Sequence, residues 1–441
     1  MNMKATLLAA AAIALSVSEE AVAGTPHVKA LHAFCKVQQA CPDGSRAISS
    51  LLSAKDGSLY GTTLYGGRGA GVVYRIAPVA GRLKYRPIHI FCTKSGPPDC
   101  KDGAVPLAGL IEDVHGNLYG TTEGSTNAFG EVFELIPNAD RSKFSLVILY
   151  TFCPGGEDQC PAGSDPNGLT YQGQQTRAQY DGVSPLYGTT TQGGARSDGG
   201  TVFELDYVTG KKKRSEKVLY NFCSQVGCPD GSFPWTPVID SAGNLYGTTQ
   251  NGGAGKEGTV FELAPNNGGY TQIVLHSFCS LANCTDGDRP LDAVTIGPDG
   301  ALYGTTQGGG AAKQGTLFKI VPNGANSQET VLYNFCAQAN CTDGAGPQTK
   351  VALDADGNIF GVTYFGGVGD GGVLFELSGS TYNILHTFCL DADCKDGLHP
   401  LAGVTLQSPS NVLGTTTAGG KYLAGTVFEY RSGSQAGAGG R

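Results

Sequence analysis

The chain has 441 residues, which is too many for one ordinary hydrophobic core, so several domains or a repeat architecture are expected. Its 67 glycines and its low share of charged residues, 15%, favour an all-β repeat protein over a helical one. The formal net charge of -8 argues against nucleic acid or an anionic membrane surface as a partner.

The first 23 residues have the pattern of a signal peptide. Lys4 supplies a positive start, residues 5–17 form an apolar run, and Ala21, Val22 and Ala23 are typical of a cleavage site. The apolar run is too short for a membrane span, and no second run follows it. We therefore expect an exported protein, periplasmic or extracellular, with no membrane span.

Three short phrases then recur seven times, and some of the copies are degenerate. They are Leu-Tyr-Gly-Thr-Thr, as at 245–249, Gly-Thr-Val-Phe-Glu-Leu, as at 200–205, and Val-Leu-Tyr-Asn-Phe-Cys, as at 218–223. β-Branched and aromatic residues bounded by Gly, Pro and Asn indicate strands. With one further strand before the first phrase, as at 106–111, each repeat holds four strands, named a to d in chain order. Four strands per repeat are typical of a β-propeller blade.

The two ends of the chain predict how the ring closes. The repeat region opens with a lone d strand at 27–34 and ends with lone a, b and c strands within 401–430. If the first strand completes the last blade, no open edge remains. We predict an all-β fold, a seven-bladed β-propeller with four antiparallel strands per blade, over residues 24–431. A flexible tail is expected at 432–441.

These phrases resemble the GloVer tandem-repeat family of bacterial exported proteins. The resemblance spans about residues 28 to 430, which is nearly all of the expected mature chain. It implies export and a repeat architecture, and it supplies no established activity. The family is known for variable C-terminal anchors, and this chain departs from that pattern because its tail has no apolar segment.

The 14 cysteines fall into one close pair per repeat, just after strand d. An even number in an exported chain favours disulfides, and one pair per blade would keep four metal ligands from converging. We predict no metal site and seven local disulfides. The pairs are Cys35–Cys41, Cys92–Cys100, Cys153–Cys160, Cys223–Cys228, Cys279–Cys284, Cys336–Cys341 and Cys389–Cys394.

An Asp-Gly pair follows the second cysteine in six of these loops, and the third repeat has Ala162-Gly163 instead. We interpret it as a tight turn, with a ring of carboxylates for a cation or for sugar hydroxyls as the alternative. Four histidines share one strand-d position that is tyrosine in the other repeats, and we interpret them as structural. They are His32, His89, His276 and His386.

Alternating strand direction places the loops between strands d and a and those between strands b and c on one face, the Cys-loop face. The Cys loop of the seventh repeat, on this face, has the densest group of charged residues that differ from the other repeats. The candidate ligand-binding residues are Asp391, Asp393, Asp396 and His399. Asp393 or Asp396 could pair with a carboxylate of another blade, as glycoside hydrolysis requires. The alternative is a solvated acidic loop.

The opposite face carries the turns between strands a and b and between strands c and d, and is called the turn face. The third repeat has a polar insertion there, at 172–183, which we interpret as a tolerated loop extension. The basic run at 211–214 lies between two strand-like segments, and we interpret it as a solvated hairpin tip.

The sequence contains no phosphate-binding loop, dinucleotide fingerprint, zinc-protease motif or nucleophile elbow. We therefore predict no cofactor and no catalytic residue. The expected function is that of a monomeric, non-catalytic binding module for a glycan or protein partner. The alternative is an extracellular carbohydrate-active enzyme, a glycoside hydrolase or polysaccharide lyase. Two unpaired carboxylates with raised pKa values in a deep central pocket would favour the enzyme.

Overall fold

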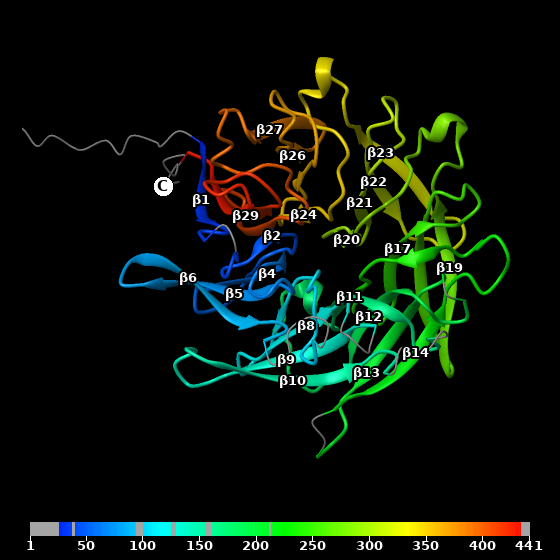
Figure 1. Ribbon diagram of the computed structural model, residues 1–441. Coiled ribbons are helices and arrows are strands. Elements are labelled where there is room, and N and C mark those ends of the chain that lie inside the picture. Colours follow the sequence, from blue (N-terminus) through cyan, green and yellow to red (C-terminus); the bar gives the residue numbers. More distant parts are fainter. Residues whose placement is uncertain are drawn as a thin grey trace, which may run out of the picture.

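The computed structural model describes residues 26–37, 40–93, 100–124, 129–154, 160–196, 198–210 and 213–433. The expected signal peptide and most of the expected tail lie outside the described residues. The described chain forms seven antiparallel sheets set as blades around a ring, so the predicted seven-bladed β-propeller is confirmed (Figure 1). Its helices are three short 3-10 turns, η1 (Gln174–Thr176), η2 (Ala282–Cys284) and η3 (Ala339–Cys341).

No helix in the described part of the chain is long and apolar enough to cross a membrane.

The blades follow one another in chain order, and strand a of blades one and four consists of two short pieces that pair with the same neighbour. The strands of blades one to three are β2 (Ser45–Ala47), β3 (Leu52–Ser53), β4 (Leu59–Tyr65), β5 (Val72–Val79), β6 (Arg82–Ile90), β7 (Ile111–Glu112), β8 (Leu118–Thr122), β9 (Glu131–Pro137), β10 (Phe144–Thr151), β11 (Ser164–Thr170), β12 (Leu186–Gln192), β13 (Thr201–Asp206) and β14 (Ser215–Asn221). Those of blades four to six are β15 (Ser232–Pro234), β16 (Val238–Ile239), β17 (Leu245–Asn251), β18 (Thr259–Asn266), β19 (Gly269–Ser277), β20 (Thr295–Ile296), β21 (Leu302–Thr306), β22 (Thr316–Val321), β23 (Gln328–Asn334), β24 (Ala352–Leu353), β25 (Ile359–Val362), β26 (Val373–Ser378) and β27 (Thr381–Thr387).

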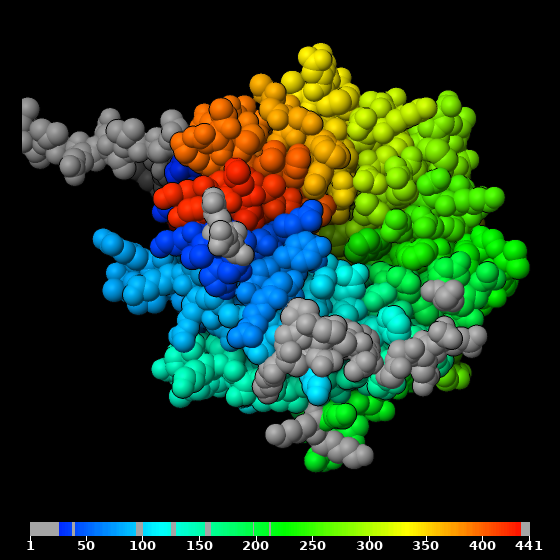
Figure 2. Space-filling view, in the orientation of Figure 1, coloured from blue at the N-terminus to red at the C-terminus, as the bar shows by residue number. Residues whose placement is uncertain are grey.

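Blade seven joins the two ends of the chain. It contains β28 (Thr405–Ser408), β29 (Asn411–Thr416), β30 (Thr426–Arg431) and, as its outer strand, β1 (His27–Ala33). β1 pairs antiparallel with β30, with Val28 opposite Tyr430 and Ala33 opposite Thr426. Figure 2 shows the blue N-terminal and red C-terminal segments side by side in the ring. The predicted closure by the N-terminal strand is therefore confirmed.

Seven hydrophobic clusters hold the ring together, each formed by two neighbouring blades. The phenylalanine at the end of one strand d packs on the aromatic residue of strand c in the next blade. Between blades three and four, the rings of Phe222 and Phe261 lie 4.9 Å apart. The Phe261 ring covers Gly247, where any side chain would collide with it. The glycine of Leu-Tyr-Gly-Thr-Thr therefore makes room for the phenylalanine of strand c.

The second threonine of the same phrase fixes the start of strand c. In blade four, Thr249 Oγ1 accepts the backbone N–H of Thr259 at 3.1 Å and lies 2.9 Å from the Thr259 hydroxyl. Blades three, five and seven repeat this threonine pair. Both hydroxyls are buried, so the pair satisfies polar groups that would otherwise lack partners.

Candidate functional site

Each loop between strand d of one blade and strand a of the next is closed by a local disulfide, as predicted. The seven bridges are Cys35–Cys41, Cys92–Cys100, Cys153–Cys160, Cys223–Cys228, Cys279–Cys284, Cys336–Cys341 and Cys389–Cys394. No cysteine remains free. The described residues contain no group of three or more His, Cys, Asp or Glu placed to hold a metal ion.

The aspartate of each Asp-Gly pair accepts a backbone N–H from its own Cys loop. Asp396 accepts the backbone N–H of Cys389 at 3.2 Å and lies 2.7 Å from His386 Nε2. Where strand d carries tyrosine, the hydroxyl takes the place of the histidine, as Tyr333 does by donating to Asp343 at 2.6 Å. These contacts support the interpretation of the Asp-Gly pairs as turns and of the histidines as structural.

Three of the four candidate residues predicted from the sequence have separate partners. Asp396 is held as described above, and exposed Asp393 forms an ion pair with Lys395 at 3.0 Å. Asp391 is also exposed on this loop. His399 instead stacks on Tyr364 of blade six, with ring centroids 4.5 Å apart. Ligand binding by these four residues stays a prediction.

His399 belongs to a ring of seven equivalent residues on the Cys-loop face, here called junction residues. Each lies at the start of strand a or just before it and has a left-handed backbone, with φ from 52° to 60°. Each donates its N–H to a carbonyl in the b-to-c loop of the preceding blade, at 2.8 to 3.1 Å. The backbone is thus fixed while the side chain differs from blade to blade. The junction residues are Arg46, Val105, Asp165, Phe233, Arg289, Gly346 and His399.

Two acids meet at the junction of blades two and three. Asp165 is the junction residue, and Glu123 follows the Thr-Thr of β8, so the pair occupies the places of His399 and Tyr364. Burial raises the pKa of Asp165 to about 6, and the nearby charge of Glu123 adds to the shift. Burial also raises the pKa of Glu123. Neither carboxylate has a hydrogen bond or ion pair with any residue of the described chain.

An exposed aromatic residue is bonded through its backbone to one member of this acid pair. Phe129, in the b-to-c loop of blade two, accepts the N–H of Asp165 on its carbonyl oxygen at 2.8 Å, and the residue is 40% exposed. Partly accessible carboxylates can accept hydrogen bonds, and an exposed aromatic residue can pack against an apolar face. We call Glu123, Phe129 and Asp165 the junction site.

A third departure from the repeat lies deeper in blade two. Glu131 replaces the threonine that starts strand c in four other blades, and it is only 5% exposed. Its Oε2 atom has no hydrogen-bond partner, and neither does the hydroxyl of Thr122. Burial raises the pKa of Glu131 to about 7, with a further contribution from Asp102. This carboxyl group therefore takes up a proton near neutral pH.

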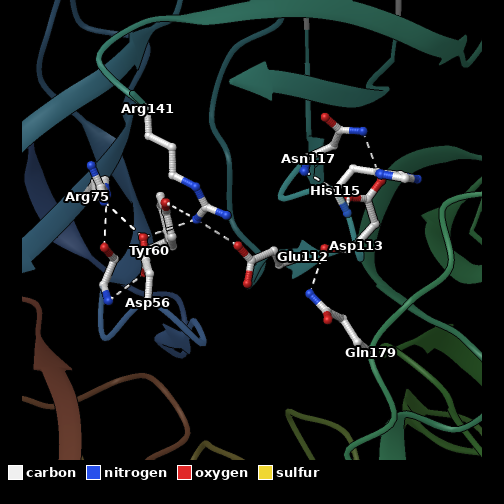
Figure 3. Close-up of polar contacts among 10 residues, drawn as sticks. Asp56, Tyr60, Arg75, Glu112, Asp113, His115, Asn117, Arg141 and Gln179 are labelled. Carbon is white, nitrogen blue, oxygen red and sulfur yellow. Dashed lines mark hydrogen bonds and ion pairs between the residues drawn. The ribbon is translucent and has the colours of Figure 1, made fainter. Parts of the chain in front are cut away.

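Polar contacts on the turn face tie blades one, two and three together (Figure 3). Arg141 of blade two donates to its own blade's Glu112 at 2.9 Å and to Asp56 of blade one at 3.3 Å. Gln179, in the insertion of blade three, donates to the carbonyl oxygen of Asp113 in blade two at 2.7 Å. The insertion is thus anchored to the neighbouring blade.

The interpretation of residues 211–214 as a solvated tip is wrong for Arg214, which is only 6% exposed. Its guanidinium donates to the Tyr180 hydroxyl at 2.7 Å and to the carbonyl oxygens of Gly182 and Ser184 at 2.8 and 3.0 Å. The insertion brings these acceptors against the start of β14, where a buried guanidinium satisfies them all.

Sequence reasoning missed Glu123, Glu131 and Asp165 because it compared the repeats mainly within the Cys loops. The signal was present in other columns of the same repeat. At the position after Thr-Thr, blade two alone has an acid; the others are Leu64, Thr191, Gln250, Gln307, Tyr364 and Thr417. Asp165 and Glu131 are likewise the only acids in their columns.

The ring of blades and the disulfide-closed loops define a repeat propeller. The chain belongs to the Gloeobacter/Verrucomicrobia repeat family, whose model matches residues 148–351 and 274–437. The resemblance inferred from the recurring phrases is therefore confirmed. A comparison with curated proteins found no match.

Several solved structures are similar in fold. The extracellular domain of a one-component system from B. thetaiotaomicron has a TM-score of 0.48 at 13% identity, with 88% of this chain and 40% of that chain covered. The polysaccharide lyase Uly1 has a TM-score of 0.49 at 10% identity, with 87% and 90% covered. Kuenenia stuttgartiensis hydrazine synthase has a TM-score of 0.48 at 13% identity, with 85% and 94% covered. This chain thus spans less than half of the first structure, and the likeness concerns the fold alone.

Proposed function

We propose that the protein is an exported, non-catalytic binding module that holds a neutral glycan at the junction site of its Cys-loop face. The observation that supports this proposal is the pair of unpartnered carboxylates, Glu123 and Asp165, together with the exposed residue Phe129, whose carbonyl oxygen accepts the Asp165 N–H. Sugar hydroxyls donate hydrogen bonds to carboxylates, and the apolar face of a sugar ring packs on an aromatic side chain.

The scaffold suits such a role. The N–H of Asp165 is bonded to the preceding blade, and disulfides close the loops on the same face. A site held in this way loses little conformational freedom on binding. Seven disulfides also indicate an oxidising compartment, which supports export.

A second candidate function is glycoside hydrolysis by the same two acids. The pKa of about 6 for Asp165 favours it, because a general acid must keep its proton near neutral pH while a second carboxylate is ionised. We favour binding over hydrolysis because the acids lie at a rim between two loops, and catalysis also needs a site that encloses the bond to be cleaved.

A glycan array followed by calorimetric titration of the full chain tests both functions. We expect a neutral oligosaccharide to bind, and Glu123→Gln and Asp165→Asn each to lower its affinity at least tenfold, as the loss of a charged hydrogen bond implies. Gln250→Ala, at the position of Glu123 in blade four, is the matched control and should leave affinity unchanged. Release of reducing ends that is abolished by Asp165→Asn would favour the hydrolase, and affinity that survives both acid substitutions would reject the junction site.

A further inference from the structure

A pocket of about 380 Å3 lies on the turn face, between the insertion of blade three and blade four. Gln172, Gln175 and Thr176 of the insertion line one side. Tyr187, at the start of β12, and Ser241, in the a-to-b turn of blade four, line the other. The insertion between strands a and b occurs only in blade three, so the pocket breaks the sevenfold repeat.

The insertion that forms the pocket wall is held by its own hydrogen bonds and by contacts with neighbouring segments. Tyr180 is 1% exposed, and its hydroxyl donates to the carbonyl oxygen of Ser184 at 2.6 Å while accepting from Arg214. The Tyr171 hydroxyl donates to the carbonyl oxygen of Ala178 at 2.7 Å. Contacts with blade two complete the attachment, which favours a wall that is formed without a ligand.

Blade four fixes the remaining edge. Gln172 Nε2 donates to the carbonyl oxygen of Ser241 at 3.1 Å, which bridges the insertion and the neighbouring turn. The Tyr187 hydroxyl lies 3.4 Å from Glu204 and donates to it, so its ring has a set orientation. Little conformational entropy would be lost when the pocket is filled.

The chemistry of the lining selects a class of ligand. Its side chains offer amide and hydroxyl groups and the ring of Tyr187, with no charged side chain among them. The Gln175 amide makes no hydrogen bond within the described part of the chain, which leaves a donor and an acceptor for a ligand. The volume lies in the usual range for small-molecule sites. We propose that this pocket is a second carbohydrate site, which binds a neutral mono- or disaccharide unit.

The proposal is independent of the junction site, because the two lie on opposite faces and share no residue. With both sites occupied, one protein would contact a polysaccharide on each face and cross-link two chains. Binding at two sites also raises the apparent affinity for any polymer that can reach both.

Saturation-transfer NMR on the full chain with cellobiose, maltose, xylobiose, mannobiose and arabinobiose tests the site. We expect at least one disaccharide to bind. Ser241→Tyr, which fills the pocket from an exposed turn, should weaken binding at least tenfold. Ala355→Tyr, at the equivalent turn position of blade six, is the matched control and should keep affinity within twofold.

The junction-site variant Glu123→Gln/Asp165→Asn separates the two proposals. Disaccharide binding that survives in this double variant and is lost in Ser241→Tyr supports the pocket. Binding that is lost in the double variant and survives in Ser241→Tyr overturns the pocket and leaves the junction site standing. No binding of any of the five disaccharides overturns the pocket as well.

Discussion

Replacing Glu131 with threonine should stabilise the protein, and more so at alkaline pH. Glu131 is buried, its Oε2 has no partner, and its pKa rises from 4.5 to about 7. Because this pKa is higher in the folded state than in the unfolded chain, the stability is fully present below pH 4.5 and falls as the pH rises through 7. At about 1.4 kcal/mol per tenfold change in ionisation, the loss is roughly 3 kcal/mol above pH 7.

Threonine is the matched residue because four blades already use it. In blade five, Thr316 donates its N–H to Thr306 Oγ1 at 3.0 Å, and the two hydroxyls lie 2.9 Å apart. Glu131→Thr should restore the same pair with Thr122, which now lacks a partner for its hydroxyl. The reverse change, Thr316→Glu, should introduce the pH-dependent penalty in blade five.

Thermal unfolding at pH 5 and pH 8, followed by calorimetry and by the fluorescence of the only tryptophan, measures the effect. The gain of Glu131→Thr over the parent should be small at pH 5 and should reach several degrees at pH 8. Comparing variant with parent at each pH removes the contribution of every other titratable group. An equal gain at both pH values would refute the reasoning, because it would mean that ionisation of Glu131 is not the cause.

Three further predictions follow from individual contacts. Asp396→Asn should lower stability by about 1 to 2 kcal/mol through its lost charged hydrogen bonds, whereas exposed Asp393→Asn should change it by less than about 0.5 kcal/mol, as thermal unfolding can check. Deleting residues 24–34 should expose the edge of β30, and gel filtration should then detect oligomers; a stable monomer would contradict the closure of the ring. Arg214→Met should cost about 3 kcal/mol and free the insertion, so trypsin should cleave after Arg177 much faster than in the parent.

The fold could be predicted from the sequence because the residues that make the packing contacts of a blade recur in each repeat. The glycine of Leu-Tyr-Gly-Thr-Thr and the phenylalanine of the next strand recur together since the ring of Phe261 needs the space above Gly247. Similarly, one Cys loop, between blades two and three, lacks the Asp-Gly aspartate. The tyrosine of the strand before it, Tyr150, donates instead to Glu216, at 3.4 Å. A contact that occurs in every blade requires the same residues in every repeat, so it can be recognised from the sequence.

The candidate sites depend on contacts that occur once. Arg214 is buried because the insertion folds back over it, and no other repeat contains an equivalent contact from which this could be learned. The pairing of Glu123 with Asp165 joins positions in two different blades, 42 residues apart, whose proximity follows only from how the blades meet. The repeat pattern of the sequence therefore predicts the scaffold. For a residue that departs from the repeat only once, the contacting residue can be identified only from the folded structure.

The junction residues give the sharpest test of whether the acid pair serves binding. A left-handed backbone costs a non-glycine residue about 1 to 2 kcal/mol, and Gly346 shows that glycine fits this position. Replacing Asp165 with glycine relieves that strain and removes a half-buried acid, while the added freedom of glycine in the unfolded chain offsets about 0.5 to 1 kcal/mol.

Asp165→Gly should therefore keep or raise the melting temperature, above all at pH 8, and abolish glycan binding. Arg289→Gly makes the same backbone change in blade five and should leave binding intact. Stability that falls by more than about 1 kcal/mol in Asp165→Gly would mean that the aspartate supports the fold. A stable variant that no longer binds would mean that the chain keeps a strained, half-buried acid at this junction for the sake of its ligand.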